Sequence, residues 1–249
     1  ARAVVQNLVK DGAAIIKIAL EPGGEHGAPW SEHHSHAPRP EHGNSLALHH
    51  PLPIPWPMLP LQTVKAIVDE AHHLHRKVTA HIGEPRGARI AIAAGVDEWA
   101  HIPCARLPDQ LWQQAIAKQI KIISTLDTLA KCEGAFDNAQ RWAKWGGELL
   151  YGAEIAHTDI PWGIDAQELA LIMKATHLPI LEVLKNATSR SGIHLGIPLL
   201  GTLQPNAPAD LIAVRGELAS DLKKLEYPDL VMSGGKIIVN NFESYNSKR

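Results

Sequence analysis

The chain has 249 residues, of which 45% are hydrophobic and 20% are charged, and its formal net charge at pH 7 is −2. This composition is typical of a globular protein with a sizeable apolar core. A charge so close to zero argues against nucleic acid as a partner, and no apolar run reaches the roughly 20 residues that cross a bilayer. The two cysteines and the lack of a recognisable signal peptide predict a cytoplasmic location.

The first sixty residues predict a helix, a strand and a long loop. Residues 2–10 have the apolar spacing of a helix, which ends at Asp11 and Gly12. The apolar run 14–20 predicts a buried strand with one lysine inside it. Residues 21–60 are rich in glycine, proline and histidine, which predicts either a functional or a disordered loop. A solvated loop and a metal-binding tract both fit its histidine-rich stretch, and the first is the commoner case.

From residue 61 onward, helices and short strands are predicted to alternate. Apolar side chains with helical spacing occur at 61–75, 86–94, 108–118, 137–145, 166–175 and 179–191, and Gly95 is predicted to cap the second of these helices. Short apolar segments that predict strands lie between them, at 77–81, 96–101, 120–126 and 148–153. With the earlier strand this alternation indicates five parallel βα units. A small β region is predicted further on, from short strands at 210–214, 230–232 and 236–239.

Four polar side chains stand within or directly after the predicted parallel strands: Lys17, His81, His101 and Glu154. In a parallel βα array, functional groups gather at the C-terminal ends of the strands. His81 and His101 are 20 residues apart, which is one βα unit. Neighbouring strands would bring both imidazoles to one edge, where they suit a divalent metal. A single histidine at a strand end is more often structural, so the joint pattern carries the prediction.

Lys17 is the unusual member of this set, because a lysine inside an apolar strand is costly to bury. An ammonium group there needs a partner or a chemical change. Burial depresses the pKa of a lysine and favours the neutral amine. Carbamylation of that amine would give a carboxylate able to bridge two metal ions.

Short motifs are spread over nearly the whole chain. They are AAIIK at 13–17, VTAH at 78–81, AGVDEWAH at 94–101, NAT at 186–188, ADLIAV at 209–214 and VMSGGK at 231–236. Together these segments resemble the amidohydrolase superfamily, in particular its imidazolonepropionase-like and prolidase-like branch.

The resemblance implies a fold and a set of metal ligands. The family fold is a distorted (β/α)8 barrel with a small β-sandwich built from both chain ends. Residues 1–198 would then form a partial TIM-like barrel, strands four to eight, and residues 199–249 the C-terminal part of the sandwich. Lys17, His81 and His101 are the implied ligands of one or two divalent metal ions, with zinc the expected metal.

The sequence departs from the family pattern at two places. The family has a His-x-His pair on strand one, and none precedes Lys17, so we expect a missing N-terminal segment or a partner chain to supply it. The spacing of His34 and His36 matches, but both follow the lysine. At the strand-eight position the family aspartate is replaced by Glu154, one methylene longer, and Asp159 is the alternative acid.

The resemblance implies a metal-dependent hydrolase that cleaves an amide or other C–N bond in a small cyclic amide or peptide-like substrate. A metal-activated water would attack the carbonyl, with Glu154 as proton acceptor. His157, Asp159 and Trp56 are the expected substrate contacts. Two alternatives stay open: a catalytically impaired relative that binds a small molecule or a partner, and one half of a two-chain enzyme. A homo-oligomer is compatible with each.

Overall fold

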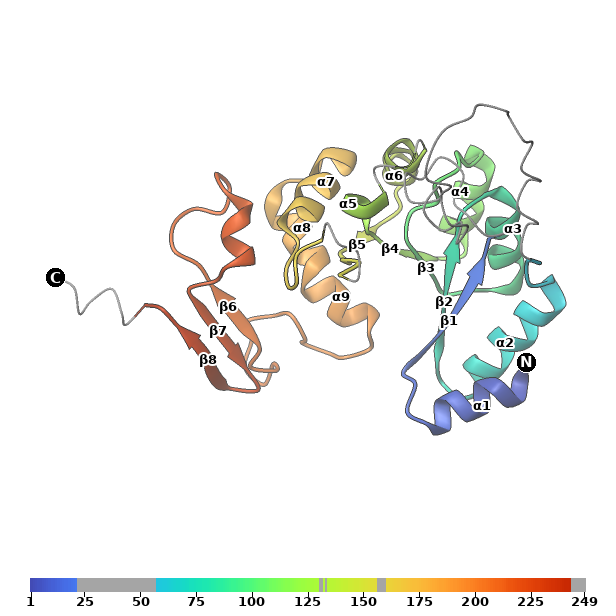
Figure 1. Cartoon of the computed structure of the whole chain (residues 1–249), viewed down its shortest axis with the longest axis horizontal. Coiled ribbons are helices and arrows are strands. Elements are labelled where there is room, and N and C mark those ends of the chain that lie inside the picture. Colours follow the sequence, from blue (N-terminus) through green and yellow to red (C-terminus); the bar gives the residue numbers. More distant parts are fainter. Residues whose placement is uncertain (22–56, 130–131, 133, 156–159, 243–249) are drawn as a thin grey trace, which may run out of the picture.

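The computed structural model describes residues 1–21, 57–129, 132, 134–155 and 160–242. Five strands form one sheet in the order β1-β2-β3-β4-β5, and every pairing is parallel. The strands are β1 (Ile15–Leu20), β2 (Lys77–Ile82), β3 (Glu98–Ala100), β4 (Lys121–Ile123) and β5 (Leu149–Leu150). In the described residues β1 and β5 are the two edges, so the sheet stays open, as predicted (Figure 1).

Helices alternate with these strands along the chain. They are α1 (Arg2–Lys10), α2 (Leu61–His73), α3 (Pro85–Ala94), α4 (Asp109–Ala117), α5 (Leu126–Leu129), α6 (Ala135–Lys144), α7 (Ala166–Thr176), α8 (Ile180–Ala187) and α9 (Ser189–His194). The predicted C-cap glycine is confirmed, because Gly95 ends α3 with a left-handed φ of 81°.

Three buried tryptophans join the sheet to the helices. The ring of Trp99 on β3 lies 5.7 Å from that of Trp112 on α4, which in turn lies 5.8 Å from Trp142 on α6. All three are at most 1% exposed. Offset and tilted aromatic pairs at this separation contribute beyond their buried area, so they fix how α4 and α6 sit on the sheet.

The prediction of a buried first strand holds for only one of its faces. Along β1 the residues alternate, with Ile16, Ile18 and Leu20 buried, whereas Ile15, Lys17 and Ala19 are exposed. Helix α3 packs on the covered side. The lysine therefore lies on the open face of the sheet and is not buried as expected. Its carbamylation stays a prediction.

Two other elements differ from the predictions. Residues 120–126 were expected to form one strand, but Leu126 begins the short helix α5. Residues 179–191 were expected to form one helix, but α8 and α9 are separated at Thr188, where φ is −128° and ψ is −97°. Gly201, at a φ of 74°, has its α-carbon so close to the backbone of Thr188 that a side chain would collide with it. The later chain therefore packs against the break.

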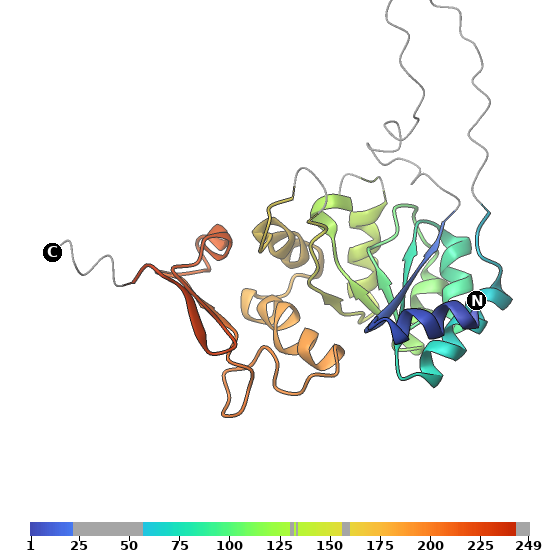
Figure 2. The same ribbon diagram turned by 60° about the horizontal axis from the view of Figure 1, so that its bottom comes forward.

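The C-terminal region forms a second sheet, which is antiparallel. Its order is β6 (Leu211–Ala213), β7 (Leu230–Ser233) and β8 (Lys236–Asn240). The turn between β7 and β8 is made by Gly234 and Gly235, both with positive φ. Helices α7, α8 and α9 lie between the two sheets (Figures 1 and 2). The boundary between residues 198 and 199 stays a prediction.

The two cysteines, Cys104 and Cys132, form a disulfide, which the sequence did not predict. The bridge ties the segment after β3 to the segment before α6. Disulfides are uncommon in cytosolic proteins, so the cytoplasmic location stays a prediction. Within the described part of the chain, no helix has both the length and the apolar character needed to cross a bilayer.

Candidate metal centre

Side chains from several strands meet at the C-terminal edge of the parallel sheet. His81 lies near the end of β2 and is paired in register with Ala19 and Ala100 on the neighbouring strands. His101 follows β3 directly, and the two imidazole ring centroids are 5.1 Å apart with an interplanar angle of 68°. The prediction that these two histidines come together is borne out by this geometry.

The backbone at His101 is what turns its ring toward His81. In a regular strand His101 would point away from the face that carries Ala100. Its φ of 78° breaks this alternation. A left-handed conformation costs a residue other than glycine about 1–3 kcal/mol and is concentrated at functional sites. The side chain is then held by Thr125, whose Oγ1 lies 2.8 Å from Nδ1 of the ring.

Each imidazole has a carboxylate beside it. The Nε2 atom of His101 is 3.6 Å from Oε1 of Glu154, and the Nε2 atom of His81 is 3.3 Å from Oε2 of Glu21. The structure thus brings together three of the four predicted residues and adds one that was missed. Glu21 follows directly after β1, a position that could have been noticed from its place behind an apolar strand.

Gly152 explains how Glu154 reaches this edge. A Cβ atom on Gly152 would lie 2.6 Å from the side chain of Ile123 and 2.7 Å from the carbonyl oxygen of Ser124. Only glycine lets the chain after β5 pass this close to the end of β4. This close backbone approach at Gly152 places Glu154 next to His101.

A buried carboxyl supports the segment that carries Thr125. Glu168 on α7 is fully buried; it accepts a short hydrogen bond from Ser124 Oγ and a 2.7 Å bond from the backbone N–H of Asp127. Burial raises the pKa of Glu168 to about 7. Asp165 caps the helix by accepting from the N–H groups of residues 167 and 168. The Asp-x-x-Glu spacing signals a helix start, but nothing in it foretold the contact with Ser124.

Lys17 lies on the open face of β1, paired in register with Thr79, two residues before His81. Within the described residues, no hydrogen bond or ion pair joins Lys17 to the two histidines, so its role as a ligand stays a prediction. The predicted substrate contacts Trp56, His157 and Asp159 lie outside the described residues.

The donor chemistry fits zinc, but the number of donors in the described part of the chain does not complete a site. Imidazole nitrogen and carboxylate oxygen are both ordinary zinc ligands. However, the described residues contain no group of three or more His, Cys, Asp or Glu side chains arranged to hold a metal ion. The site therefore consists of two imidazole–carboxylate pairs side by side.

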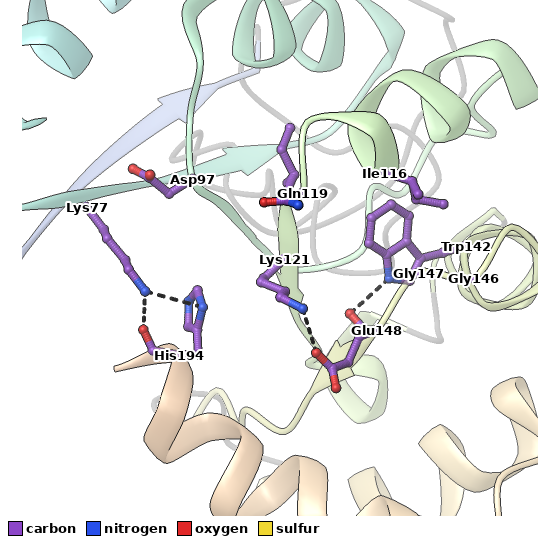
Figure 3. Close-up of a pocket in the computed structure, with 11 residues that line it drawn as sticks. Lys77, Asp97, Ile116, Gln119, Lys121, Trp142, Gly146, Gly147, Glu148 and His194 are labelled. Atoms are coloured by element: carbon purple, nitrogen blue, oxygen red, sulfur yellow. Dashed lines mark hydrogen bonds and ion pairs between the residues drawn. The ribbon is translucent and has the colours of Figure 1, made fainter. Parts of the chain in front are cut away.

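A pocket of about 510 Å³ lies at the other end of the strands (Figure 3). Lys77 and Lys121 begin β2 and β4, and Asp97 and Glu148 directly precede β3 and β5. Lys121 pairs with Glu148 at 2.7 Å, and the ammonium of Lys77 donates to the carbonyl of His194. The N-terminal end of a parallel βα array serves stability, so this pocket is not the candidate site.

Known proteins resemble the chain in sequence and in fold. No family model matches the chain. In sequence the chain is 28% identical to ochratoxinase of Aspergillus niger over 197 residues, which cover 71% of this chain and 41% of that protein. The chain thus spans less than half the length of the curated relative it matches.

Solved structures show the fold. The A. niger ochratoxinase structure matches with a TM-score of 0.71 at 22% identity, over 96% of this chain and 54% of that one. A Xaa-Pro dipeptidase with bound methionine matches with a TM-score of 0.71 at 20% identity, over 96% of this chain and 58% of that one.

The chain is therefore an α/β protein. Its five-stranded parallel sheet and small antiparallel sheet correspond to part of a larger barrel protein. The predicted resemblance to the amidohydrolase superfamily agrees with the sequence similarity to ochratoxinase and with the fold of solved structures that include an amidohydrolase.

Proposed function

We propose that the chain is part of a metal-dependent hydrolase that cleaves an amide or other C–N bond in a small cyclic amide or peptide-like substrate. The observation that carries this proposal is the meeting of His81, His101 and Glu154 at the C-terminal edge of the sheet, in a chain similar in sequence to ochratoxinase. In this proposal β1 to β5 are strands four to eight of the barrel, and the antiparallel sheet is the C-terminal part of the β-sandwich.

His81, His101 and a carbamylated Lys17 are the residues we assign to one or two divalent metal ions, with zinc the expected metal. A bound zinc ion lowers the pKa of a coordinated water to about 7 and polarises a substrate carbonyl. The protein's own contribution is orientation. Thr125 fixes the ring of His101 through Nδ1, which leaves Nε2 directed toward Glu154.

Glu154 is the proton acceptor in this proposal. Its side chain is 30% exposed, so the carboxylate is reachable from solvent while one oxygen stays beside His101. A general base must come within about 2.6–3.2 Å of the proton donor, and in a protein without substrate such contacts are often longer. His157, Asp159 and Trp56 complete the proposal as substrate contacts.

The chain covers 41% of ochratoxinase, so we assign the remaining donors to a further segment or to a partner chain. This agrees with the two pairs of donors in the described residues, where no group of three is found. The chain alone should therefore bind zinc weakly. The cytoplasmic location and a homo-oligomer are part of the same proposal and are open to fractionation and sedimentation experiments.

The test measures zinc binding and hydrolysis separately. Zinc affinity of the purified chain is measured by calorimetry, and turnover is followed on N-acyl amino acids, cyclic amides and Xaa-Pro dipeptides in excess zinc. His101→Ala should weaken zinc binding, whereas Glu154→Gln should abolish any turnover and leave zinc binding nearly unchanged. Wild-type zinc affinity in His101→Ala would show that the strand edge is not a metal site.

One observation favours a catalytically impaired relative as the second candidate. Glu154 occupies the position where the resemblance implies aspartate, and its carboxylate is 3.6 Å from His101. The Glu154→Asp variant separates the two readings. Activity that is retained or raised in this variant supports a hydrolase, whereas zinc binding without turnover in both proteins supports a binding protein.

A further inference from the structure

Glu21 is a carboxylate that the proposed function does not use, although it lies inside the same cluster. It follows β1 directly, and its Oε2 atom is 3.3 Å from Nε2 of His81. Both side chains are 19% exposed. The Oε2 atom itself is fully covered and, among the described residues, has no hydrogen-bond partner. A covered carboxylate oxygen without a hydrogen bond is costly unless a cation satisfies it.

The distance between Oε2 of Glu21 and Nε2 of His81 matches that of two ligands on one metal ion. An N–H···O hydrogen bond spans 2.7–3.2 Å between heavy atoms. Two ligands that each lie about 2.0–2.1 Å from a tetrahedral zinc ion are about 3.3 Å apart. The pair at 3.3 Å therefore has the spacing of two ligands on one ion.

A glycine, Gly83, lies directly beside the carboxylate of Glu21. Gly83 follows β2, and a Cβ atom added to it would lie 2.8 Å from Oε2 of Glu21. The backbone of Gly83 does not have the positive φ that would require glycine. Its small size is therefore explained by the space that the carboxylate of Glu21 occupies beside His81.

We infer that Glu21 is a direct metal ligand that pairs with His81, so that this chain brings a glutamate to the metal centre from the end of β1 in addition to Lys17. The inference rests on the proposed function, because it takes the strand edge to be a metal site. Besides Lys17 it predicts three metal ligands along this edge, Glu21, His81 and His101, next to Glu154 as the proton acceptor.

Zinc affinity of the chain, measured by calorimetry and by competition with a chromophoric chelator, tests the inference without any activity assay. Loss of a residue that only supports a ligand costs 10- to 100-fold in metal affinity, so loss of a ligand should cost at least tenfold. Glu21→Gln and Glu21→Ala should both weaken zinc binding by at least this factor. Glu84→Gln, which removes the same charge nearby, should leave it unchanged.

Gly83→Ala provides a second, independent test. The added methyl group displaces the flexible end of Glu21 and should weaken zinc binding in the wild-type background. In the Glu21→Gln background the same change should have no further effect. Thermal unfolding of each variant shows whether the fold is retained.

Each other outcome overturns a defined part of the inference. If Glu21→Gln binds zinc like the wild type while Glu21→Ala does not, the side chain only positions His81 by a hydrogen bond that glutamine can still make. If His81→Ala weakens binding and neither Glu21 variant does, Glu21 is no ligand but the metal site stands. If the wild-type chain binds no zinc, or if His81→Ala leaves affinity unchanged, the metal site and the inference both fail.

Discussion

The two ends of the parallel sheet carry charged side chains in different ways. At the N-terminal end, around the pocket in Figure 3, Lys121 meets Glu148 at 2.7 Å, within hydrogen-bond range. At the C-terminal end, the imidazole–carboxylate pairs stand at 3.3 and 3.6 Å, and His101 adopts a left-handed backbone conformation. The pocket in Figure 3 is thus lined by charged side chains that pair with one another. The cluster at the C-terminal end instead brings two imidazole rings within 5.1 Å of each other, each with a carboxylate beside it.

From this difference we expect the N-terminal end of the sheet to contribute to stability and the C-terminal end to bind metal. Variants at the N-terminal end should change the free energy of unfolding and leave zinc affinity unchanged. Variants at the C-terminal end should do the reverse, with smaller effects on stability.

The largest effect on the free energy of unfolding is expected at Trp142, at the N-terminal end of the sheet. Its indole is 1% exposed, donates from Nε1 to the carbonyl of Glu148 at 3.0 Å and packs against Trp112. Trp142→Ala should lower the free energy of unfolding by about 3–5 kcal/mol, because it leaves a cavity and an unpaired carbonyl. Denaturant unfolding measures this, and zinc calorimetry on the folded protein should show no change in affinity.

Trp145 supplies the matched control, because it is 38% exposed on the same part of the chain. Trp145→Ala should change the free energy of unfolding by less than about 1 kcal/mol. A loss of zinc affinity in Trp142→Ala without loss of stability would contradict the division between the two ends.

Removal of the disulfide is expected to have the next largest effect on the free energy of unfolding. Cys104 and Cys132 close a loop with a sequence separation of 28 residues. The entropy of closing such a loop corresponds to about 3–4 kcal/mol of stability. Replacing both cysteines by serine should lower the free energy of unfolding by about that amount. Thiol titration of the unfolded protein, with and without reductant, establishes whether the bridge forms. Two titratable thiols without reductant would contradict it.

Glu168 predicts a dependence of stability on pH. Burial raises the pKa of its carboxyl from 4.5 to about 7, so the folded protein holds this proton more tightly than the unfolded chain does. Between about pH 4.5 and 7 this group therefore makes the protein less stable as pH rises, by up to about 3 kcal/mol. Its contribution is most favourable below pH 4.5, and the loss is complete above pH 7.

The Glu168→Gln variant isolates this contribution from those of other groups. Its amide cannot ionise, so the difference in unfolding free energy between variant and wild type should change between pH 5 and pH 7.5 in favour of the variant. Denaturant unfolding at both pH values measures it. A difference that stays constant would show that Glu168 titrates normally. Glu217→Gln is the control, because among the described residues the Glu217 side chain takes part in no buried hydrogen-bond network.

The regular elements were predictable from the sequence, because they depend on local spacing. Five parallel strands followed from short apolar segments, and Gly95 was recognised as a helix end. His101 was placed at the correct strand end, but its turned backbone was not foreseen, since residue type alone does not indicate a positive φ there. The carboxyls of Glu21 and Glu168 were missed for a different reason. Their partners lie 60 and 44 positions away in the sequence, and only tertiary packing brings them together.

A small effect on stability is expected at Thr125, which can be compared directly with a second buried threonine. Its hydroxyl oxygen lies 2.8 Å from Nδ1 of His101 in a buried setting. Thr125→Val keeps the shape and removes the hydrogen bond, which costs about 1 kcal/mol of stability. Zinc affinity should fall by 10- to 100-fold, because a supporting hydrogen bond fixes the tautomer and the orientation of a ligating imidazole.

Thr79 on β2 provides the same substitution at a position where the hydroxyl is buried and, among the described residues, has no hydrogen-bond partner. Thr79→Val should therefore be neutral or stabilising, since it removes a buried hydroxyl that satisfies no partner. It should also leave zinc affinity unchanged. Equal zinc affinities in the two valine variants would mean that Thr125 does not orient His101. A fall in Thr125→Val alone would tie the left-handed turn at His101, and the contact that Thr125 makes with its ring, to the metal site.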